Sequence, residues 1–167
     1  SDRLRSSESN LKLHLLDFEG NLLFKEEIKQ NIKANKAEIL WSTDLASLIK
    51  EYDRSKLVFS IKLADEKGKE YKNLLYFSEP KNLALSKAEI TIQKVDSEKG
   101  NKFLISTDKL VKNLYLETKT SGRFSDNFFD LMANESIEIE FINTEEKTIQ
   151  AQDIKMMSLY DTLSKYD

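Results

Sequence analysis

Cysteine is absent from this chain of 167 residues. Its absence excludes a disulfide framework, a thiolate nucleophile and a cysteine-ligated zinc or iron–sulfur cluster. Glycine and proline are scarce, with four and one residues, which excludes collagen-like and linker-type compositions. The longest uninterrupted apolar run, Leu74–Phe77, is far shorter than the ~18–20 residues of a membrane-spanning helix or the apolar part of a secretion signal.

Neither sign of charge dominates the chain. It has 26 Lys and Arg residues against 29 Asp and Glu residues, for a formal net charge of -3. This balance excludes an extended phosphate-binding surface and a polybasic membrane patch, so neither nucleic acid nor a membrane is expected as a partner. With 40% hydrophobic and 33% charged residues, the composition is that of a soluble globular protein with a packed core.

Apolar and polar residues alternate with a period of two through most of the chain. Leu11, Leu13 and Leu15 alternate with Lys12 and His14, which predicts a half-buried β-strand. Turn signals such as the Gly-Asn pair at 20–21 separate further runs of the same kind and predict hairpins. The additional strands are predicted at 22–32, 37–41, 57–63, 71–77, 90–92, 103–105, 114–116, 137–141 and 154–156, with further turns at 65–68 and 96–101.

One segment departs from the period of two. Leu45, Leu48, Ile49 and Tyr52 recur at helical spacing, which predicts a short helix. Ser42 or Thr43 is the expected N-cap, and Asp44 favours the positive end of the helix dipole. A single short helix between strands is compatible with an all-β protein.

The only proline marks the best domain boundary. Pro80 lies where the apolar alternation lapses, and a proline cannot donate a hydrogen bond in a central strand. The pattern then starts again. The sequence therefore predicts an all-β chain of two consecutive β-sandwich domains, residues 1–78 and 79–167, with one short connecting helix.

Residues suited to chemistry are few. His14 is the only histidine, so a histidine-based metal site or catalytic triad has no second histidine to use, and a solvated surface residue is the prediction. Glu138 and Glu140 share one strand face, where alternating carboxylates serve solubility. The segment Asp96–Asn101 lacks the ligand spacing of a calcium loop. No catalytic residue, cofactor site or metal site is therefore predicted.

Aromatic side chains are the remaining candidates for a ligand surface, because sugars stack their apolar ring faces on flat aromatic rings. Trp41 follows two apolar residues, which favours a packing role in the core or between domains. The other candidates are Tyr52, Tyr71, Tyr76, Tyr115 and Tyr160.

The most distinctive segment is Ser121–Leu131, which is both polar and aromatic. Its Ser, Asp and Asn side chains can bond nearby backbone N–H groups, and its Phe side chains can hold the segment against a core. We expect a self-braced connection between two strands. A rigid loop presented to a ligand or to a neighbouring domain is the alternative.

The same segment resembles the signature near the C-terminus of β-mannosidases of glycoside hydrolase family two. Further landmarks of that region follow in the expected order at 1–4, 15–20, 76–83 and 158–161. Where the family has Pro-Gly after the signature, this chain has Met132–Glu135, and Asn134 is expected to supply a positive φ. The residues that carry the resemblance are Gly122, Arg123, Phe124, Ser125, Asp126, Asn127, Phe129 and Asp130.

The resemblance implies two immunoglobulin-like domains that follow a catalytic barrel in one polypeptide. It further implies that the parent releases terminal β-linked mannose by a retaining mechanism and acts on β-mannoside glycans. No segment here corresponds to the barrel, so the chain is expected to be a noncatalytic C-terminal fragment, with the beginning of its first strand missing. A bacterial glycan-degrading parent would be periplasmic or secreted. The alternatives are a carbohydrate-binding module, the same region of a β-galactosidase-like enzyme, and an adhesin-like sandwich that binds protein.

Overall fold

The computed structural model describes residues 7–95, 100–145 and 147–163. The chain forms two compact units: 1–17 with 21–84, and 18–20 with 85–167. The changeover between Ala84 and Leu85 lies a few residues beyond the predicted boundary, and the limits 1–78 and 79–167 stay a prediction. The landmark at 1–4, the missing start of the first strand and most of the turn at 96–101 lie outside the described residues.

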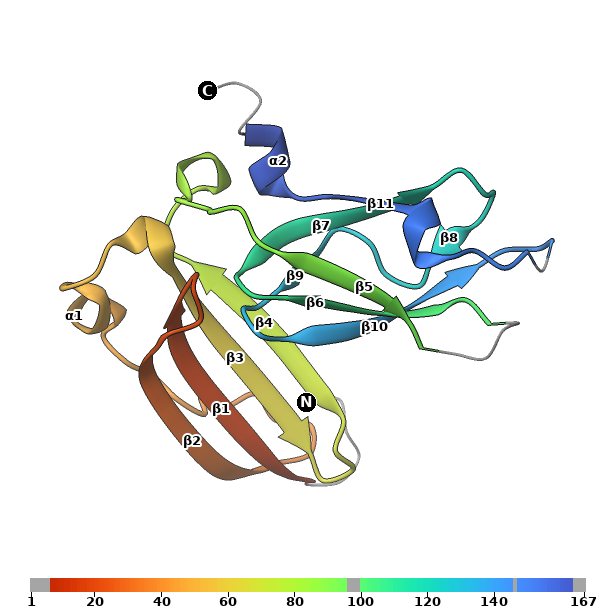
Figure 1. The fold of residues 1–167 in the computed structure, drawn as a ribbon. Coiled ribbons are helices and arrows are strands. Elements are labelled where there is room, and N and C mark those ends of the chain that lie inside the picture. Colours follow the sequence, from red (N-terminus) through yellow and green to blue (C-terminus); the bar gives the residue numbers. More distant parts are fainter. Residues whose placement is uncertain (1–6, 96–99, 146, 164–167) are drawn as a thin grey trace. The chain divides into compact units, whose positions relative to one another are not determined.

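Unit 1 is built on one antiparallel sheet with the strand order β2-β1-β3-β4 (Figure 1). Leu11, Leu13 and Leu15 of β1 lie on one face and are buried, as their alternation predicts. On β3 they lie opposite Leu63, Ile61 and Phe59. The strands are β1 (Ser7–Asp17), β2 (Leu22–Ile32), β3 (Leu57–Asp65) and β4 (Glu70–Tyr76).

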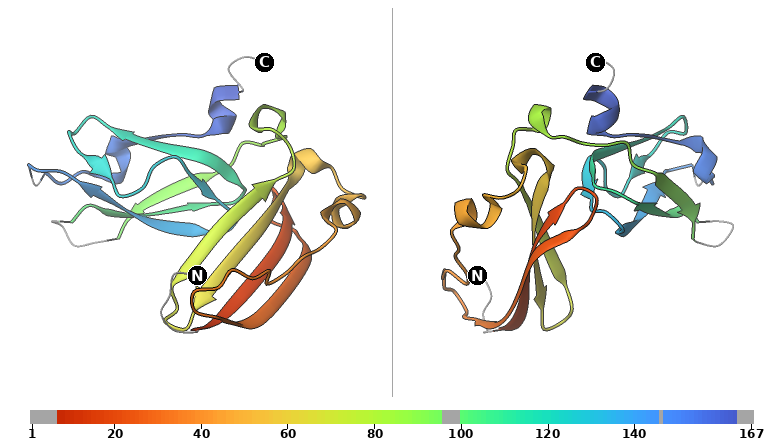
Figure 2. Two further views of the ribbon diagram at one scale, coloured as in Figure 1. Left: turned by 180° about the vertical axis from the view of Figure 1, so that it is seen from behind. Right: turned by 60° about the vertical axis from the view of Figure 1, so that its left-hand side comes forward.

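The segment between β2 and β3 covers the apolar face of this sheet (Figure 2). It contains the helix α1 (Leu45–Ile49), which the helical spacing predicts, and a single 3₁₀ turn at Arg54–Lys56. The N-cap predicted at Ser42 or Thr43 is wrong. Asp44 is the cap, because its carboxylate accepts hydrogen bonds from Ala46 N at 3.1 Å and Ser47 Oγ at 2.6 Å.

The strand predicted at Ala37–Trp41 is also wrong. The segment is irregular and has no strand partner among the described residues. Its apolar residues therefore indicate packing against the core of unit 1 rather than pairing with another strand. Trp41 stacks on Phe59 with ring centroids 5.7 Å apart, and its Nε1 donates to Glu26 Oε2 at 2.8 Å. The packing role predicted for Trp41 is confirmed, while Ile39 of the same segment is 86% exposed.

Unit 2 is a sandwich of two antiparallel sheets. One has the order β5-β6-β10-β8 and the other β11-β7-β9, and they lie on opposite sides of the core (Figure 1). The core takes Phe103 and Ile105 from the first sheet and Leu114 and Leu116 from the second. The strands are β5 (Ile90–Lys94), β6 (Lys102–Thr107), β7 (Val111–Thr118), β8 (Arg123–Phe124), β9 (Phe129–Leu131), β10 (Ser136–Ile142) and β11 (Ile154–Met157).

Apart from short helical segments the described chain is all-β, as predicted. A second short helix, α2 (Leu159–Leu163), follows β11 and was not predicted. The sequence feature that indicates the start of this helix is the Ser158…Asp161 pair. The Asp161 carboxylate accepts hydrogen bonds from Ser158 N and Oγ at 2.7 and 2.8 Å. Neither helix in the described residues is long and apolar enough to cross a membrane.

Candidate functional site

The segment Ser121–Leu131 crosses from one sheet of unit 2 to the other. Its first part forms β8, which pairs with β10 through Phe124↔Phe141. Its last part forms β9, which pairs with β7 through Phe129↔Leu114. The segment therefore connects the two sheets of unit 2, and we refer to Ser121–Leu131 as the strap.

The strap begins with a close approach of backbone to core. A Cβ on Gly122 would lie 2.5 Å from Phe141 Cζ and 2.7 Å from Ile142 O, so no larger residue fits without displacing β10. Phe124 packs on Phe141 with ring centroids 5.1 Å apart. Ser125 extends the pairing: its N–H donates to Glu140 O at 2.7 Å, and its Oγ accepts from Glu140 N at 3.0 Å.

Asn127 attaches the strap to the opposite sheet. Its Oδ1 accepts from Leu116 N at 2.8 Å and its Nδ2 donates to Leu116 O at 3.0 Å. The side-chain amide thus replaces a neighbouring strand for one residue of β7. Asp126 Oδ1 accepts from Asn127 N at 2.8 Å and fixes the approach of Asn127.

Asp130 holds an irregularity in β7. The pairing register of β7 and β9 shifts between Val111 and Leu114, and Asn113 in this bulge has a φ of 52°. Asp130 Oδ1 accepts from Asn113 N at 2.8 Å, while its Oδ2 lies 3.2 Å from Lys112 Nζ in a largely buried ion pair. The carboxylate therefore satisfies a backbone N–H that the bulge removes from the ladder.

Arg123 and Phe128 are two exposed residues of the strap. Arg123 is exposed, and Phe128 is 65% exposed with a φ of 61°. The ring of Phe128 stacks on Tyr115 of β7 with centroids 4.8 Å apart. The sequence analysis includes Tyr115 among the aromatic candidates for a ligand surface. It expects Phe128 to anchor the segment in the core because the Phe128 side chain is apolar, and it therefore misses Phe128 as an exposed residue.

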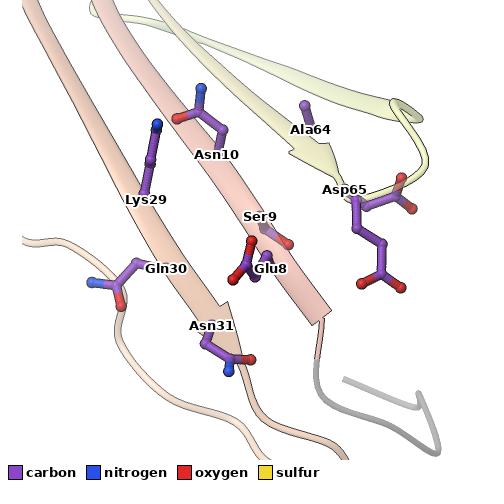
Figure 3. Close-up of a pocket in the computed structure, with 9 residues that line it drawn as sticks. Glu8, Ser9, Asn10, Lys29, Gln30, Asn31, Ala64 and Asp65 are labelled. Atoms are coloured by element: carbon purple, nitrogen blue, oxygen red, sulfur yellow. The ribbon is translucent and has the colours of Figure 1, made fainter.

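A polar hollow of about 410 Å³ lies at one end of the unit 1 sheet (Figure 3). In the ladder Glu8 pairs with Asn31, and Asn10 with Lys29, and Figure 3 shows the four polar side chains at this end. Asp65 also lines it, but its carboxylate accepts from two backbone N–H groups of the β3–β4 turn. None of the described residues that line the hollow is aromatic.

His14 is not the solvated residue that the sequence predicts. It is half-buried on β1 between Lys25 and Ser60 of the adjacent strands, and its Nε2 is buried without a hydrogen-bond partner in the described structure. Burial, followed by the charges of Lys25, Lys62 and Lys12, lowers the pKa of His14. The alternation placed His14 on the polar face, but it could not show that both flanking strands restrict access to water.

The predicted carboxylate pair on β10 lies on an exposed face. Glu138 and Glu140 are both exposed, and Glu138 Oε1 is 3.3 Å from Lys102 Nζ. Within the described residues, no three His, Asp or Glu side chains are grouped closely enough to hold a metal ion.

Family models match both halves of the chain in succession. Residues 1–82 match the mannosidase Ig/CBM-like domain, and residues 85–162 match an Ig-fold domain model named for mannosidases. Each half of the chain therefore belongs to a family of immunoglobulin-like domains named for mannosidases. These two mannosidase domains account for nearly all of its residues, and no curated protein matches it in sequence.

Solved structures with the same fold are much longer chains. The mannosidase domains match a β-D-mannosidase from Dictyoglomus thermophilum with a TM-score of 0.69 and 21% identity, covering 95% of this chain and 19% of that chain. They also match a complex of the Amycolatopsis orientalis exo-chitosanase CsxA with a TM-score of 0.53 and 10% identity, covering 95% of this chain and 23% of that chain. At these identities the likeness shows the fold. This chain spans about a fifth of those proteins.

Proposed function

We propose that this chain is the noncatalytic C-terminal β-sandwich region of a family-two glycoside hydrolase resembling β-mannosidase. Its parent would release terminal β-mannose by a retaining mechanism. The observation that carries the proposal is the succession of two mannosidase domain families along nearly the whole chain. The likeness to about a fifth of the Dictyoglomus β-mannosidase supports it.

Three exposed carboxylates of unit 1 have structural partners. Hydrogen bonds from Asn10, Ser47 and Ser55 lower the pKa of Glu27, Asp44 and Asp53, whereas the acid of a retaining glycosidase needs a raised pKa. Those three carboxylates brace the surface of unit 1.

The partner in this proposal is the catalytic barrel of the same polypeptide, which the two domains would buttress. The family-signature residues Gly122–Asp130 would serve this role by keeping the two sheets of unit 2 in fixed register. Apart from Arg123, their polar side chains bond backbone groups of β7, β10 and the strap itself, so we assign these residues a structural rather than a catalytic part.

A carbohydrate-binding module is the second candidate. It is supported by the CBM-like description of the family that matches residues 1–82. The same region of a β-galactosidase-like enzyme is a third, because a shared fold leaves the substrate open. Because both matching families are named for mannosidases, β-mannoside glycans are the proposed substrate of the parent.

The test is hydrolysis of nitrophenyl β-glycosides by the full-length parent, with this chain assayed beside it. The panel contains the mannoside, galactoside, glucuronide and glucosaminide. Cleavage of the mannoside by the parent and no cleavage by the chain is the expected result. Preferred cleavage of another glycoside would contradict the proposed mannoside substrate. An inactive parent would contradict the proposal that it is a glycoside hydrolase.

A further inference from the structure

Phe128 is exposed in a conformation that costs free energy. A bulky L-residue in the left-handed region is strained, and Phe128 adopts a φ of 61° with 65% of its surface exposed. Asn127 Oδ1 accepts from its N–H at 3.1 Å, which holds the backbone in place. Strain that yields no burial is characteristic of positions with a function.

The strained residue supports an aromatic platform. Phe128 stacks on Tyr115 at 4.8 Å with 30° between the rings. On the neighbouring strand, Met157 lies opposite Tyr115 and is 38% exposed. Phe128 thus packs against the Tyr115 ring, and Tyr115 lies between the buried Leu114 and Leu116, so its side chain is on the outer face of the β11-β7-β9 sheet.

A hollow begins beside this platform. It has a volume of about 390 Å³, and the residues that line it include Tyr115 and Glu117 of β7, Thr120, and Arg123 and Phe124 of β8. A second hollow of about 450 Å³ shares Glu117, Thr118 and Thr120 with the first. The two hollows therefore adjoin along the end of β7, each has the size of a ligand site, and we refer to them together as the groove.

The chemistry of the groove selects the ligand. Arg123 and Glu117 are exposed, and neither side chain forms a hydrogen bond or ion pair within the part of the chain that the structure describes. Their charges cancel in the first hollow, while Glu117 and Asp153 offset Lys119 and Lys155 in the second. A balanced lining rich in hydroxyl, carboxylate and guanidinium groups suits a neutral ligand with many hydroxyls. The aromatic platform requires that this ligand also have an apolar face.

We propose that this groove in unit 2 is a binding site for a neutral oligosaccharide of hexopyranose units. Tyr115, held by Phe128, stacks on one sugar ring, and Arg123 and Glu117 hydrogen-bond its hydroxyls. The site goes beyond the proposed buttressing role and lies outside the residues that the CBM-like family matches. Either proposal can fail while the other stands.

The test is titration of this chain with β-1,4-mannotriose and, separately, with cellotriose, followed by NMR chemical shifts and calorimetry. Titration to about 20 mM saturates a site with a Kd of about 1 mM. The expected result is saturable binding of at least one trisaccharide, with shifts centred on β7 and on residues 120–128. If neither sugar binds saturably, the proposal is wrong. The aromatic pair of Phe128 and Tyr115 would then be interpreted as a surface that docks a protein.

Three variants and one matched control locate the site. Tyr115→Ala and Arg123→Ala are each expected to weaken binding about tenfold or more, the loss that one stacking contact or one charged hydrogen-bonding group produces. Tyr71→Ala is the control, because Tyr71 is an exposed tyrosine on unit 1, outside the proposed site. If Tyr115→Ala lowers the melting temperature, Phe128→Ala and Arg123→Ala carry the test. Equal affinity in all variants, or a loss confined to Tyr71→Ala, would refute the site.

Discussion

The side chain of Asn127 forms two hydrogen bonds with the backbone of Leu116, at 2.8 and 3.0 Å. Leu116 is 2% exposed, so water cannot replace Asn127 at either group without entering the core. This pair joins the signature strap to β7 where no strand of the described unit covers that edge. At Leu116 the attachment of the strap therefore depends on an amide side chain rather than on a ladder.

Asn127→Ala is expected to destabilise the chain by about 2–3 kcal/mol, because it removes two hydrogen bonds and leaves a buried N–H and C=O without partners. Denaturant unfolding measures this loss. Asp126→Ala is the control, since Asp126 bonds only the adjacent exposed backbone. Equal effects of the two substitutions would show that Leu116 finds another partner.

Gly122→Ala is expected to cost about 1–3 kcal/mol, because the added methyl group overlaps the Phe141 ring and the Ile142 carbonyl. These atoms lie 2.5 and 2.7 Å from the position of the new carbon. Thermal unfolding would report the loss, and Ser121→Ala at the exposed neighbouring position should leave the melting temperature within error. An unchanged melting temperature for Gly122→Ala would mean that β10 moves aside freely.

The turn at Met132–Glu135 makes a prediction about backbone conformation. Asn134 has a φ of 61°, as expected from the sequence, and its N–H donates to Thr107 O at 3.0 Å. Asn134→Ala should destabilise unit 2 by about 1 kcal/mol, since Cβ disfavours this region. Asn134→Gly should leave stability nearly unchanged or raise it. A larger loss for glycine than for alanine would contradict the role of φ.

His14 predicts a pH dependence of stability. Burial and then Lys25, Lys62 and Lys12 lower its pKa in the fold, against a smaller opposing effect of Glu27. The unfolded chain therefore binds a proton at a higher pH than the fold does, so the unfolding free energy falls as pH drops below the usual histidine value of about 6.5.

His14→Gln should remove this component of the pH dependence. Urea unfolding of both proteins between about pH 8 and pH 5 gives the difference, because the carboxyl groups titrate in both. We expect the wild type to lose stability relative to His14→Gln as the pH falls. A parallel pair of curves would show that His14 titrates alike in the folded and unfolded chains.

The sequence by itself determined the class of the protein and most strand positions. Leu11, Leu13 and Leu15 could only be buried together on one face of an extended segment, and Asn134 was one of the few residues that tolerate the turn conformation. These are local properties, because each depends on the spacing or backbone preference of residues close together in the chain.

The tertiary structure alone decided which segments find a partner. The apolar residues of Ala37–Trp41 have strand-like composition, yet the segment packs over a sheet whose strands already pair with one another. Likewise, no spacing rule pairs Asn127 with Leu116 or stacks Phe128 on Tyr115. Local pattern states which side of a segment avoids water. Which backbone lies beside it depends on contacts between residues far apart in the sequence, and those contacts form only when the whole core assembles.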